Sequence, residues 1–511
     1  MIERLSPKFW MALVALAAVA LYLPSLGYDF VYDSVMQIHY DTFIHEPRHF
    51  ADVLSLRVLG MDVLDFNRPV NLFTLMVDSL LWGKNPAGYR LTNLLLHGAT
   101  AALLLRWLRL LTDGRLWPAL LATLVFVVHP VHTEVVVETS YREDLLVTFF
   151  LLAGLNAAEA FRPGRKGRTW GPALLTVGSL FLAAASKESG AAGPVALAAF
   201  WLLFRQGKGD NAGAWGLLLG AATAGVVLFF ALRFSLEPNP SLVFPSAPGA
   251  IAAPGIDWLL VQTRIWSAEF LRLLWPAHLC ADYGPANLQP IDPSVALLAL
   301  LTLGAAQAVG SLWNRKIALG SLLFWAALAP VSNLVPIYHP MADRYLYLPM
   351  MGVALLLAAA LAGITRRPAR IAAGTAGLAA VGLLAATTLR QERTWRDGST
   401  LWAEAARENP ASLNAWIGCG DAALDKGDPA QAIPFYERAS TLAREHSAQA
   451  FGGIALAEAA RGRQAEAAKA LASATKLDSR YAKPETLVRA VVLPAYQAQT
   501  FTLIGLRARH P

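Results

Sequence analysis

Long apolar runs separated by short polar segments dominate the chain up to about residue 390. Each run has roughly the 20 residues that a helix needs to cross the hydrocarbon core of a bilayer. Hydrophobic residues make up 55% of the 511 residues and charged residues 15%, and a soluble domain has no interior large enough for that composition. The chain is therefore predicted to be an all-α polytopic membrane protein. About eleven spans are expected, at about 9–26, 92–111, 116–129, 143–161, 170–186, 190–204, 213–233, 291–313, 316–334, 345–364 and 371–389.

The distribution of Lys and Arg sets the predicted orientation. Arg4 and Lys8 precede the first run and place the N-terminus in the cytoplasm. If the spans alternate in direction, every short basic cluster falls on the cytoplasmic side, as the positive-inside rule requires. The net charge of +7 thus reflects membrane orientation, and no basic stripe with interleaved aromatic residues indicates a nucleic-acid partner. The clusters are Arg106, Arg109 and Arg115; Arg162, Arg165, Lys166 and Arg168; Arg205 and Lys208; Arg315 and Lys316; and Arg366, Arg367 and Arg370.

Four segments are then predicted to be extracytoplasmic. The third contains an apolar stretch at 256–275 that carries Arg264 and Arg272 in its interior. Counting this stretch as a span would move Arg366 and its basic neighbours to the outer side, so we predict an amphipathic or re-entrant helix at the outer interface. The four outer segments are about 27–91, 129–142, 234–290 and 338–344.

The composition changes after Arg390, where Ala, Glu, Arg and Gln at helical spacing replace the apolar runs. Two segments of this tail match at an interval of about 35 residues, close to that of tetratricopeptide (TPR) hairpins. We predict a membrane domain at 1–390 and a TPR-like α-solenoid at 391–511, which an odd number of spans places outside the cytoplasm. The matches are Trp416 with Phe451, Lys426-Gly427 with Arg461-Gly462, Ala432 with Ala467, and Ala439 with Ala474.

Five segments and the tail, taken in order, resemble a known family. The segments are FVYDSVMQI, NRPVNLFTLMVDSLLWGKNPAGYRLTNLLLH, HPVHTEVVVETSYREDLLVTFFLL, ASKESG and HPMADRYLYLPMMG. The series resembles the transmembrane-and-TPR O-mannosyltransferase group and its bacterial relatives, which belong to the GT-C class of polyprenyl-phosphate-dependent glycosyltransferases. The resemblance implies a GT-C-like fold, an extracytoplasmic catalytic face, and transfer of a sugar from a lipid phosphate to a protein hydroxyl.

Asp33, in the first outer segment, is the candidate general base. A carboxylate within hydrogen-bond reach of the acceptor hydroxyl can take its proton, and a single displacement would invert the anomeric centre. Without the family context, a solvated aspartate that caps a helix is the simpler interpretation. Family members often carry two adjacent acids here, whereas Asp33 is followed by Ser34. Either the second acid is dispensable, or Asp29 or Asp41 replaces it, or the chain is inactive.

The departing phosphate needs cationic partners, and Arg344 is the leading candidate. It lies beside Tyr345 at the outer end of a predicted span, where a planar guanidinium can bind phosphate oxygens at headgroup depth. The alternative is an interfacial anchor flanked by aromatic residues. Arg68 and Arg142 are weaker candidates for the same role.

Two other outer groups suggest polar contacts without a metal. His129, His132 and Glu134 have a His-x-x-His-x-Glu spacing that fits neither a zinc-protease helix nor a closed structural zinc site. We predict an inward-facing hydrogen-bonding cluster there and no metal site. Lys187 and Glu188 flank a short outer turn, where they form either a weak surface pair or a contact to the donor phosphate.

Alternative functions remain open at the level of the sequence. The same donor could glycosylate an envelope glycan or lipid, or the chain could be a non-catalytic scaffold that assembles a complex through its repeats. In the favoured interpretation the partners are a polyprenyl-phosphate-linked sugar, an acceptor protein docked on the repeats and membrane lipid. The alternative role for the repeats is intramolecular packing over the catalytic loops. No cofactor is predicted, and metal dependence is left open. The Ala-, Gly-, Leu- and Arg-rich composition hints at a bacterial inner membrane, a periplasmic tail and undecaprenyl phosphate as the lipid. Neither the sugar nor the acceptor follows from the residues.

Overall fold

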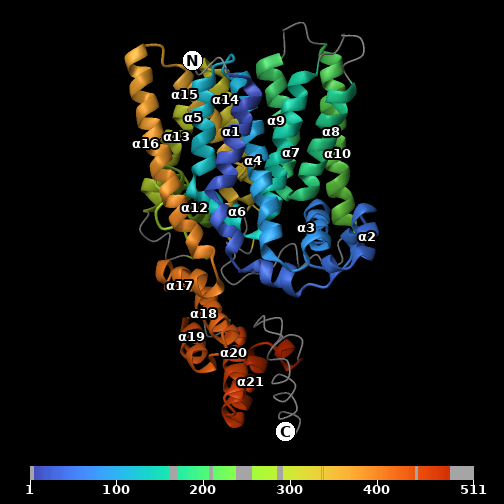
Figure 1. The fold of residues 1–511 in the computed structure, drawn as a ribbon, viewed down its shortest axis with the longest axis vertical. Helices are drawn as coiled ribbons and strands as arrows, with labels where there is room; N and C mark the ends of the chain where they lie inside the picture. The colour runs from blue at the N-terminus through green and yellow to red at the C-terminus, as the bar shows by residue number, and fades with distance from the viewer. Residues whose placement is uncertain are drawn as a thin grey trace. The chain divides into compact units, whose positions relative to one another are not determined.

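The computed structural model describes residues 5–161, 170–205, 211–236, 256–284, 292–334, 337, 339–442 and 447–483. Every regular element in these ranges is a helix (Figure 1). The chain forms two compact units. The larger unit comprises Met1–Tyr28, Asp41–Ala277 and Ile291–Glu392, and the composite unit comprises Asp29–Tyr40, His278–Pro290 and Arg393–Pro511. The predicted boundary at residue 390 stays a prediction, but two short segments that precede it belong to the composite unit.

Helices that run side by side build the larger unit (Figure 1). Four of its described helices, α4, α10, α13 and α16, are long and apolar enough to cross a membrane, and α5 with its bent continuation α6 can count as a fifth. The helices are α1 (Pro7–Leu21), α2 (Phe50–Leu54), α3 (Pro69–Trp82), α4 (Pro86–Leu111), α5 (Leu116–Val128), α6 (Thr133–Val137), α7 (Arg142–Ala160), α8 (Trp170–Ser186), α9 (Ala192–Phe200), α10 (Ala212–Leu236), α12 (Ile256–Leu274), α13 (Pro293–Trp313), α14 (Arg315–Leu328), α15 (Met350–Ala362) and α16 (Arg367–Glu392).

Each predicted span coincides with at least one of these helices, yet eleven crossings stay a prediction. Several helices are shorter than a bilayer requires, such as α1, α8 and α15, and α5 bends by 52° where it meets the next helix. The stretch at 256–275 is helical, as predicted, and its interfacial position stays a prediction. Helix α3 was not predicted, because its 14 residues are too few for a span and lie in what reads as a loop.

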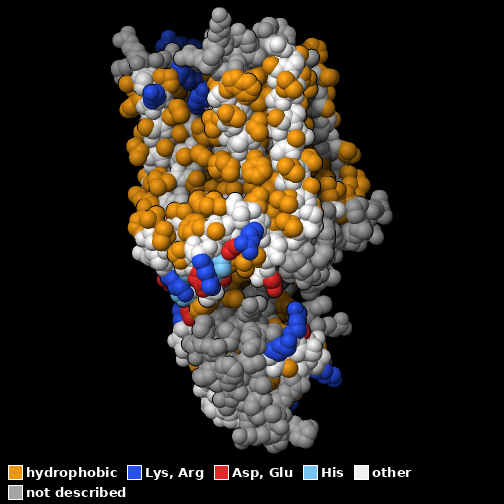
Figure 2. Space-filling view, turned by 90° about the vertical axis from the view of Figure 1, so that its right-hand side faces the viewer, with side chains coloured by type: hydrophobic (Ala, Val, Ile, Leu, Met, Phe, Trp, Pro, Cys, Tyr) orange, Lys and Arg blue, Asp and Glu red, His pale blue; other side chains and the backbone are white. Residues whose placement is uncertain are grey.

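The surface of the larger unit has the pattern of a protein embedded in lipid. Figure 2 shows a broad band of hydrophobic side chains, with Lys and Arg gathered at one border and charged side chains of both signs at the other. Leu217 and Leu228 on α10, and Leu298 and Leu301 on α13, are among the large apolar side chains that this unit exposes. Water would make such exposure costly, whereas lipid tails do not.

Close backbone contacts fix two turns that carry polar residues. A Cβ atom at Gly190 would lie 2.4 Å from the carbonyl of Ala183, so the turn after α8 packs directly against that helix. A Cβ atom at Gly352, in the first turn of α15, would lie 2.6 Å from the Gly320 carbonyl oxygen on α14. Only glycine allows backbones to approach this closely, and both contacts hold the ends of neighbouring polar segments in place.

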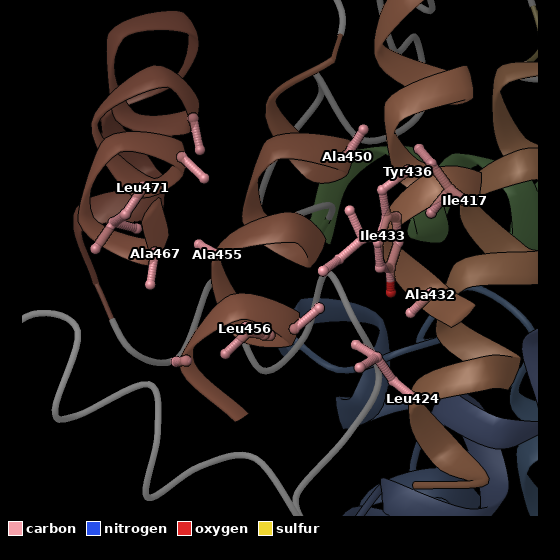
Figure 3. Packing of buried hydrophobic residues seen from close by; sticks show 14 of the residues in the cluster. Ile417, Leu424, Ala432, Ile433, Tyr436, Ala450, Ala455, Leu456, Ala467 and Leu471 are labelled. Atoms are coloured by element: carbon pink, nitrogen blue, oxygen red, sulfur yellow. The ribbon is translucent and has the colours of Figure 1, made fainter. Parts of the chain in front are cut away.

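The composite unit is built on five helices of the tail: α17 (Gly398–Glu408), α18 (Leu413–Asp425), α19 (Pro429–Leu442), α20 (Ala448–Ala460) and α21 (Gln464–Leu477). Figure 3 shows how Tyr436 of α19 and small or branched residues of the neighbouring helices form its core. Gly427 and Gly462, which follow α18 and α20, have φ angles of +76° and +77°, as the helix-ending turns require. These are two of the matched positions, although the TPR assignment itself stays a prediction.

Candidate functional site

Charged side chains from four segments of the larger unit meet around Arg68, which directly precedes α3. Its guanidinium lies 3.0 Å from Glu143 of α7, 3.2 Å from Asp65 and 3.4 Å from Glu188. Burial alone would lower the pKa of Arg68, but the surrounding carboxylates raise it well above its usual value. The Arg68 side chain is 23% exposed, so the most richly paired cation of the cluster still reaches the surface.

The turn after α8 supplies the next two members of this cluster. Lys187 is buried and pairs with Asp144, and its amine lies 3.8 Å from Glu143. Glu188 pairs with Arg68 and, at 2.9 Å, with Arg233 of α10. Burial alone would raise the pKa of Glu188, but the two guanidinium groups hold it well below its usual range. Lys187 and Glu188 therefore do not form the mutual surface pair that the sequence left open.

Arg344 forms a second centre within the larger unit. It lies in the short turn Asp343–Leu346 before α15. Its backbone N–H donates to Glu134 Oε2 at 2.9 Å, and its guanidinium pairs with the other oxygen of the same carboxylate. The guanidinium also lies 4.2 Å from the ring centre of Tyr141 and 5.1 Å from that of Tyr345. Arg344 is thus a buried, planar cation held between a carboxylate and two rings.

Tyr345 connects the two centres. Its ring centre lies 5.8 Å from the Lys187 amine, while Arg344 approaches the same ring. Its hydroxyl donates to the carbonyl of His339 at 2.9 Å. Burial, and then the charge of Arg344, lowers the pKa of His339 to about 3, so this imidazole is neutral at neutral pH. Arg344 is thus linked to Lys187 through the Tyr345 ring, and Lys187 is linked to Arg68 through Glu143.

Arg142 is enclosed in a different set of contacts. It donates to Asn93 Oδ1 at 2.7 Å and to the Tyr89 carbonyl at 2.9 Å, and it pairs with Asp78 at 2.5 Å. Its side chain has no exposed surface. These contacts tie α7 to α3 and α4. The contact of Arg142 to phosphate stays a prediction.

The histidines of HPVHTE lie at the bend between α5 and α6. His129 donates from Nε2 to the Leu273 carbonyl at 3.1 Å. His132 packs against Phe126 and Tyr347, with ring centres 4.6 Å apart in both cases, and neither of its ring nitrogens has a hydrogen-bond partner among the described residues. Among those residues, no group of three or more His, Cys, Asp or Glu side chains is arranged to hold a metal ion.

Asp33 belongs to the composite unit, where it is exposed. The next residue, Ser34, is fully buried: its hydroxyl donates to the Val31 carbonyl at 2.6 Å and accepts from the Val31 N–H at 3.1 Å. Ser34 therefore closes a turn in the place where a second acid was expected. Asp29 is exposed in the same unit, whereas Asp41 lies in the larger unit and accepts from the Phe43 N–H.

Arg233 and Asp65 belong to the charged cluster but were not singled out by the sequence analysis. Arg233, at the end of α10, is 97% buried in its pairing with Glu188, and Asp65 accepts from Asn71 at 3.0 Å while it pairs with Arg68. A signal for Arg233 was present, because it is a lone cation at the predicted outer end of a span, where the positive-inside rule expects none. Asp65 carries no comparable signal.

Comparison with known proteins supplies relatives along most of the chain. Protein O-mannosyl-transferase TMTC4 from Mus musculus is 27% identical over 492 residues, which cover 84% of this chain and 66% of the relative. The mouse TMTC3 enzyme is 24% identical, with coverage of 84% and 50%, and Drosophila melanogaster Tmtc1 is 28% identical, with coverage of 61% and 39%. No family model matches the chain.

The chain is a homologue of the transmembrane-and-TPR O-mannosyltransferases. It spans about half to two thirds of the length of the mouse relatives. Among solved structures, ArnT from Cupriavidus metallidurans bound to undecaprenyl phosphate aligns with a TM-score of 0.45 and 14% identity, over 98% of this chain and 89% of that one. With four described helices that are long and apolar enough to cross a membrane, this homologue is an integral membrane protein.

Proposed function

We propose that the protein is a glycosyltransferase that moves a sugar from a polyprenyl-phosphate donor to a hydroxyl group of an extracytoplasmic protein. The single observation that carries this proposal is the similarity to protein O-mannosyl-transferases along 84% of the chain. The buried cationic cluster supports it, because an enzyme that breaks a sugar–phosphate bond needs positive charge at the departing phosphate.

Arg68 and Arg344 are the proposed phosphate ligands, with Lys187 between them. Arg68 distributes its hydrogen bonds among three carboxylates and is partly exposed, so an incoming phosphate can replace one of these partners. Arg344 is more tightly held by Glu134, which orients its plane. Arg142 is left out of the binding set because its side chain has no exposed surface and already pairs with Asp78.

Asp33 is the proposed general base. Its carboxylate takes the proton of the acceptor hydroxyl as that oxygen forms a bond to the anomeric carbon of the sugar. The bond between this carbon and the phosphate oxygen breaks on the opposite side, and the lipid phosphate leaves with the electron pair. A single displacement of this kind inverts the anomeric centre and requires no covalent enzyme intermediate.

The decisive experiment measures glycosylation in cells. A deletion strain is complemented with wild type, Asp33→Asn or the matched control Asp41→Asn, and its extracytoplasmic proteins are analysed by mass spectrometry. We expect wild type and Asp41→Asn to restore a sugar mass on specific Ser or Thr residues, and Asp33→Asn to be expressed normally without restoring it. Normal glycosylation with Asp33→Asn would remove Asp33 from the mechanism. If deletion of the repeats produces a phenotype and Asp33→Asn produces none, the alternative function, a non-catalytic membrane scaffold, is favoured.

A further inference from the structure

The segment that carries the proposed base is held by aromatic contacts to the tail. Tyr32, directly before Asp33, stacks on Trp402 of α17, with ring centres 5.1 Å apart and planes inclined by 26°. Trp395 approaches the same ring at 6.2 Å. Both tryptophans and the whole of Asp29–Tyr40 belong to the composite unit. The side chain next to the base therefore lies on the first helix of the tail.

The backbone at this point is in an unusual conformation. Tyr32 has a φ angle of +54°, in the left-handed region that bulky residues seldom adopt. Surrounding contacts must stabilise such a residue, and the Ser34 turn and the Trp402 stack both do so. The Asp29 N–H also donates to the Arg396 carbonyl at 3.0 Å, so the segment is fastened to the tail at Asp29 as well as at Tyr32.

Helix α18 in turn fixes the position of Trp402. A Cβ atom at Gly418 would lie 2.2 Å from the indole ring, so the tryptophan lies flat on the backbone of α18. A second segment is fastened to the same corner: Asn409 donates to the Asp282 carbonyl at 3.2 Å, and Ser412, which caps α18, donates to the Asp282 carboxylate. Helices α17 and α18 thus hold two segments that come from distant parts of the chain.

We propose that α17 and α18 position the catalytic base, and that Trp402 is the positioning residue acting through Tyr32. The inference rests on the proposed role of Asp33. According to this inference, α17 and α18 are needed in every catalytic cycle, whichever acceptor protein the later helices of the tail bind. Removing the whole tail therefore abolishes transfer to all acceptors and cannot by itself reveal an acceptor-docking function.

The test compares Trp402→Ala and Trp402→Phe in the full-length protein. Trp416→Ala is the matched control, because Trp416 stacks on Phe435 at 6.1 Å within the same unit and does not touch Tyr32. A peptide with the acceptor site identified by mass spectrometry is titrated against each variant. We expect Trp402→Ala to lower kcat about a hundredfold with little change in the KM for peptide, since small misplacements of a catalytic group have effects of that size. Trp402→Phe restores most of the rate, and Trp416→Ala leaves kcat near that of wild type.

Hydrogen–deuterium exchange gives a readout that does not depend on activity. In Trp402→Ala, amides of residues 29–40 should exchange faster, while those of α20 and α21 stay protected. Unchanged exchange at 29–40 with full kcat would overturn the positioning role. Because Asp33→Asn is measured in parallel, the two proposals are separable: full activity of Asp33→Asn refutes the base, whereas an inactive Asp33→Asn beside a fully active Trp402→Ala refutes only the positioning.

Discussion

Replacing Arg344 and replacing Arg68 would have different effects on the carboxylates that each arginine pairs with. Loss of the Arg344 side chain would leave Glu134, which is 97% buried, without its ion partner, and breaking a buried pair costs about 3–5 kcal/mol. An Arg344→Ala variant would therefore confuse instability with lost binding. Arg68 is a better probe, because each of its carboxylates has another partner or some exposure to water.

Arg68→Gln is expected to weaken binding of a lipid phosphate about ten- to a hundredfold, since hydrogen bonds to charged groups contribute about 1.5–3 kcal/mol each. Binding of undecaprenyl phosphate to the purified protein in detergent, measured by native mass spectrometry, checks this. Arg57→Gln is the control, because Arg57 is 78% exposed and lies outside the cluster. Equal affinity for the lipid in both variants would show that Arg68 does not bind the phosphate.

At the scale of elements, the tail shows how small residues set helix spacing. The Tyr436 ring fits between Gly420 of α18 and Gly453 of α20, where added Cβ atoms would lie within 2.6 and 2.4 Å of it. Its hydroxyl donates to Asp421 at 2.6 Å. Burial raises the pKa of Asp421 well above its usual value, and the hydrogen bond from Tyr436 acts in the opposite direction. The Tyr436 hydroxyl therefore gives this buried carboxyl group a polar partner in the core. One tyrosine therefore links three successive helices.

Gly453→Val should destabilise the composite unit by about 1–3 kcal/mol, because the new side chain must displace the Tyr436 ring from a packed core. Gly398→Ala is the matched control, since its Cβ atom would meet only Ala422 at an ordinary 3.8 Å. The stability of the composite unit in the two full-length variants is compared by thermal unfolding, with the protease sensitivity of the tail as the readout. Equal sensitivity of the two variants would contradict this account of the helix spacing.

Sequence periodicity was sufficient for most helices and failed at identifiable places. The apolar runs and the glycines that end α18 and α20 are local signals, and the structure has helices and turns where they occur. Helix α3 was missed because a short apolar helix within a polar loop has no distinctive period. The partners of Arg68 could not be predicted, because Asp65, Glu143 and Glu188 come together only through the packing of separate helices.

For the whole molecule, the orientation in the membrane decides whether the proposed chemistry is possible. Asp33 and the tail share one compact unit, so they must lie on the same side of the membrane. A lipid-linked donor used outside the cytoplasm requires that this side be the outer one. The arrangement of the composite unit could not be predicted from the sequence, because a boundary drawn along the chain cannot show that residues 29–40 pack with residues some 370 positions later.

Reporter fusions test this orientation. We expect a fusion after residue 28 and one after residue 400 to be active only with a reporter that functions outside the cytoplasm, because both positions flank segments of the same unit. A fusion at Arg315, between α13 and α14, should behave in the opposite way and serves as the control. Cytoplasmic reporter activity at residue 400 would exclude the proposed function in its present form.

The mixed origin of the composite unit has a consequence for biosynthesis. Residues 29–40 leave the ribosome early, yet the helix surfaces that hold them, in α17 and α18, are translated more than 350 residues later. Nascent chains that have not yet reached α18 therefore lack the contacts that hold the proposed base, so the proposed transfer reaction has to wait until α18 has been translated. A ribosome that stalls before about codon 425 would release a membrane-anchored product without transferase activity.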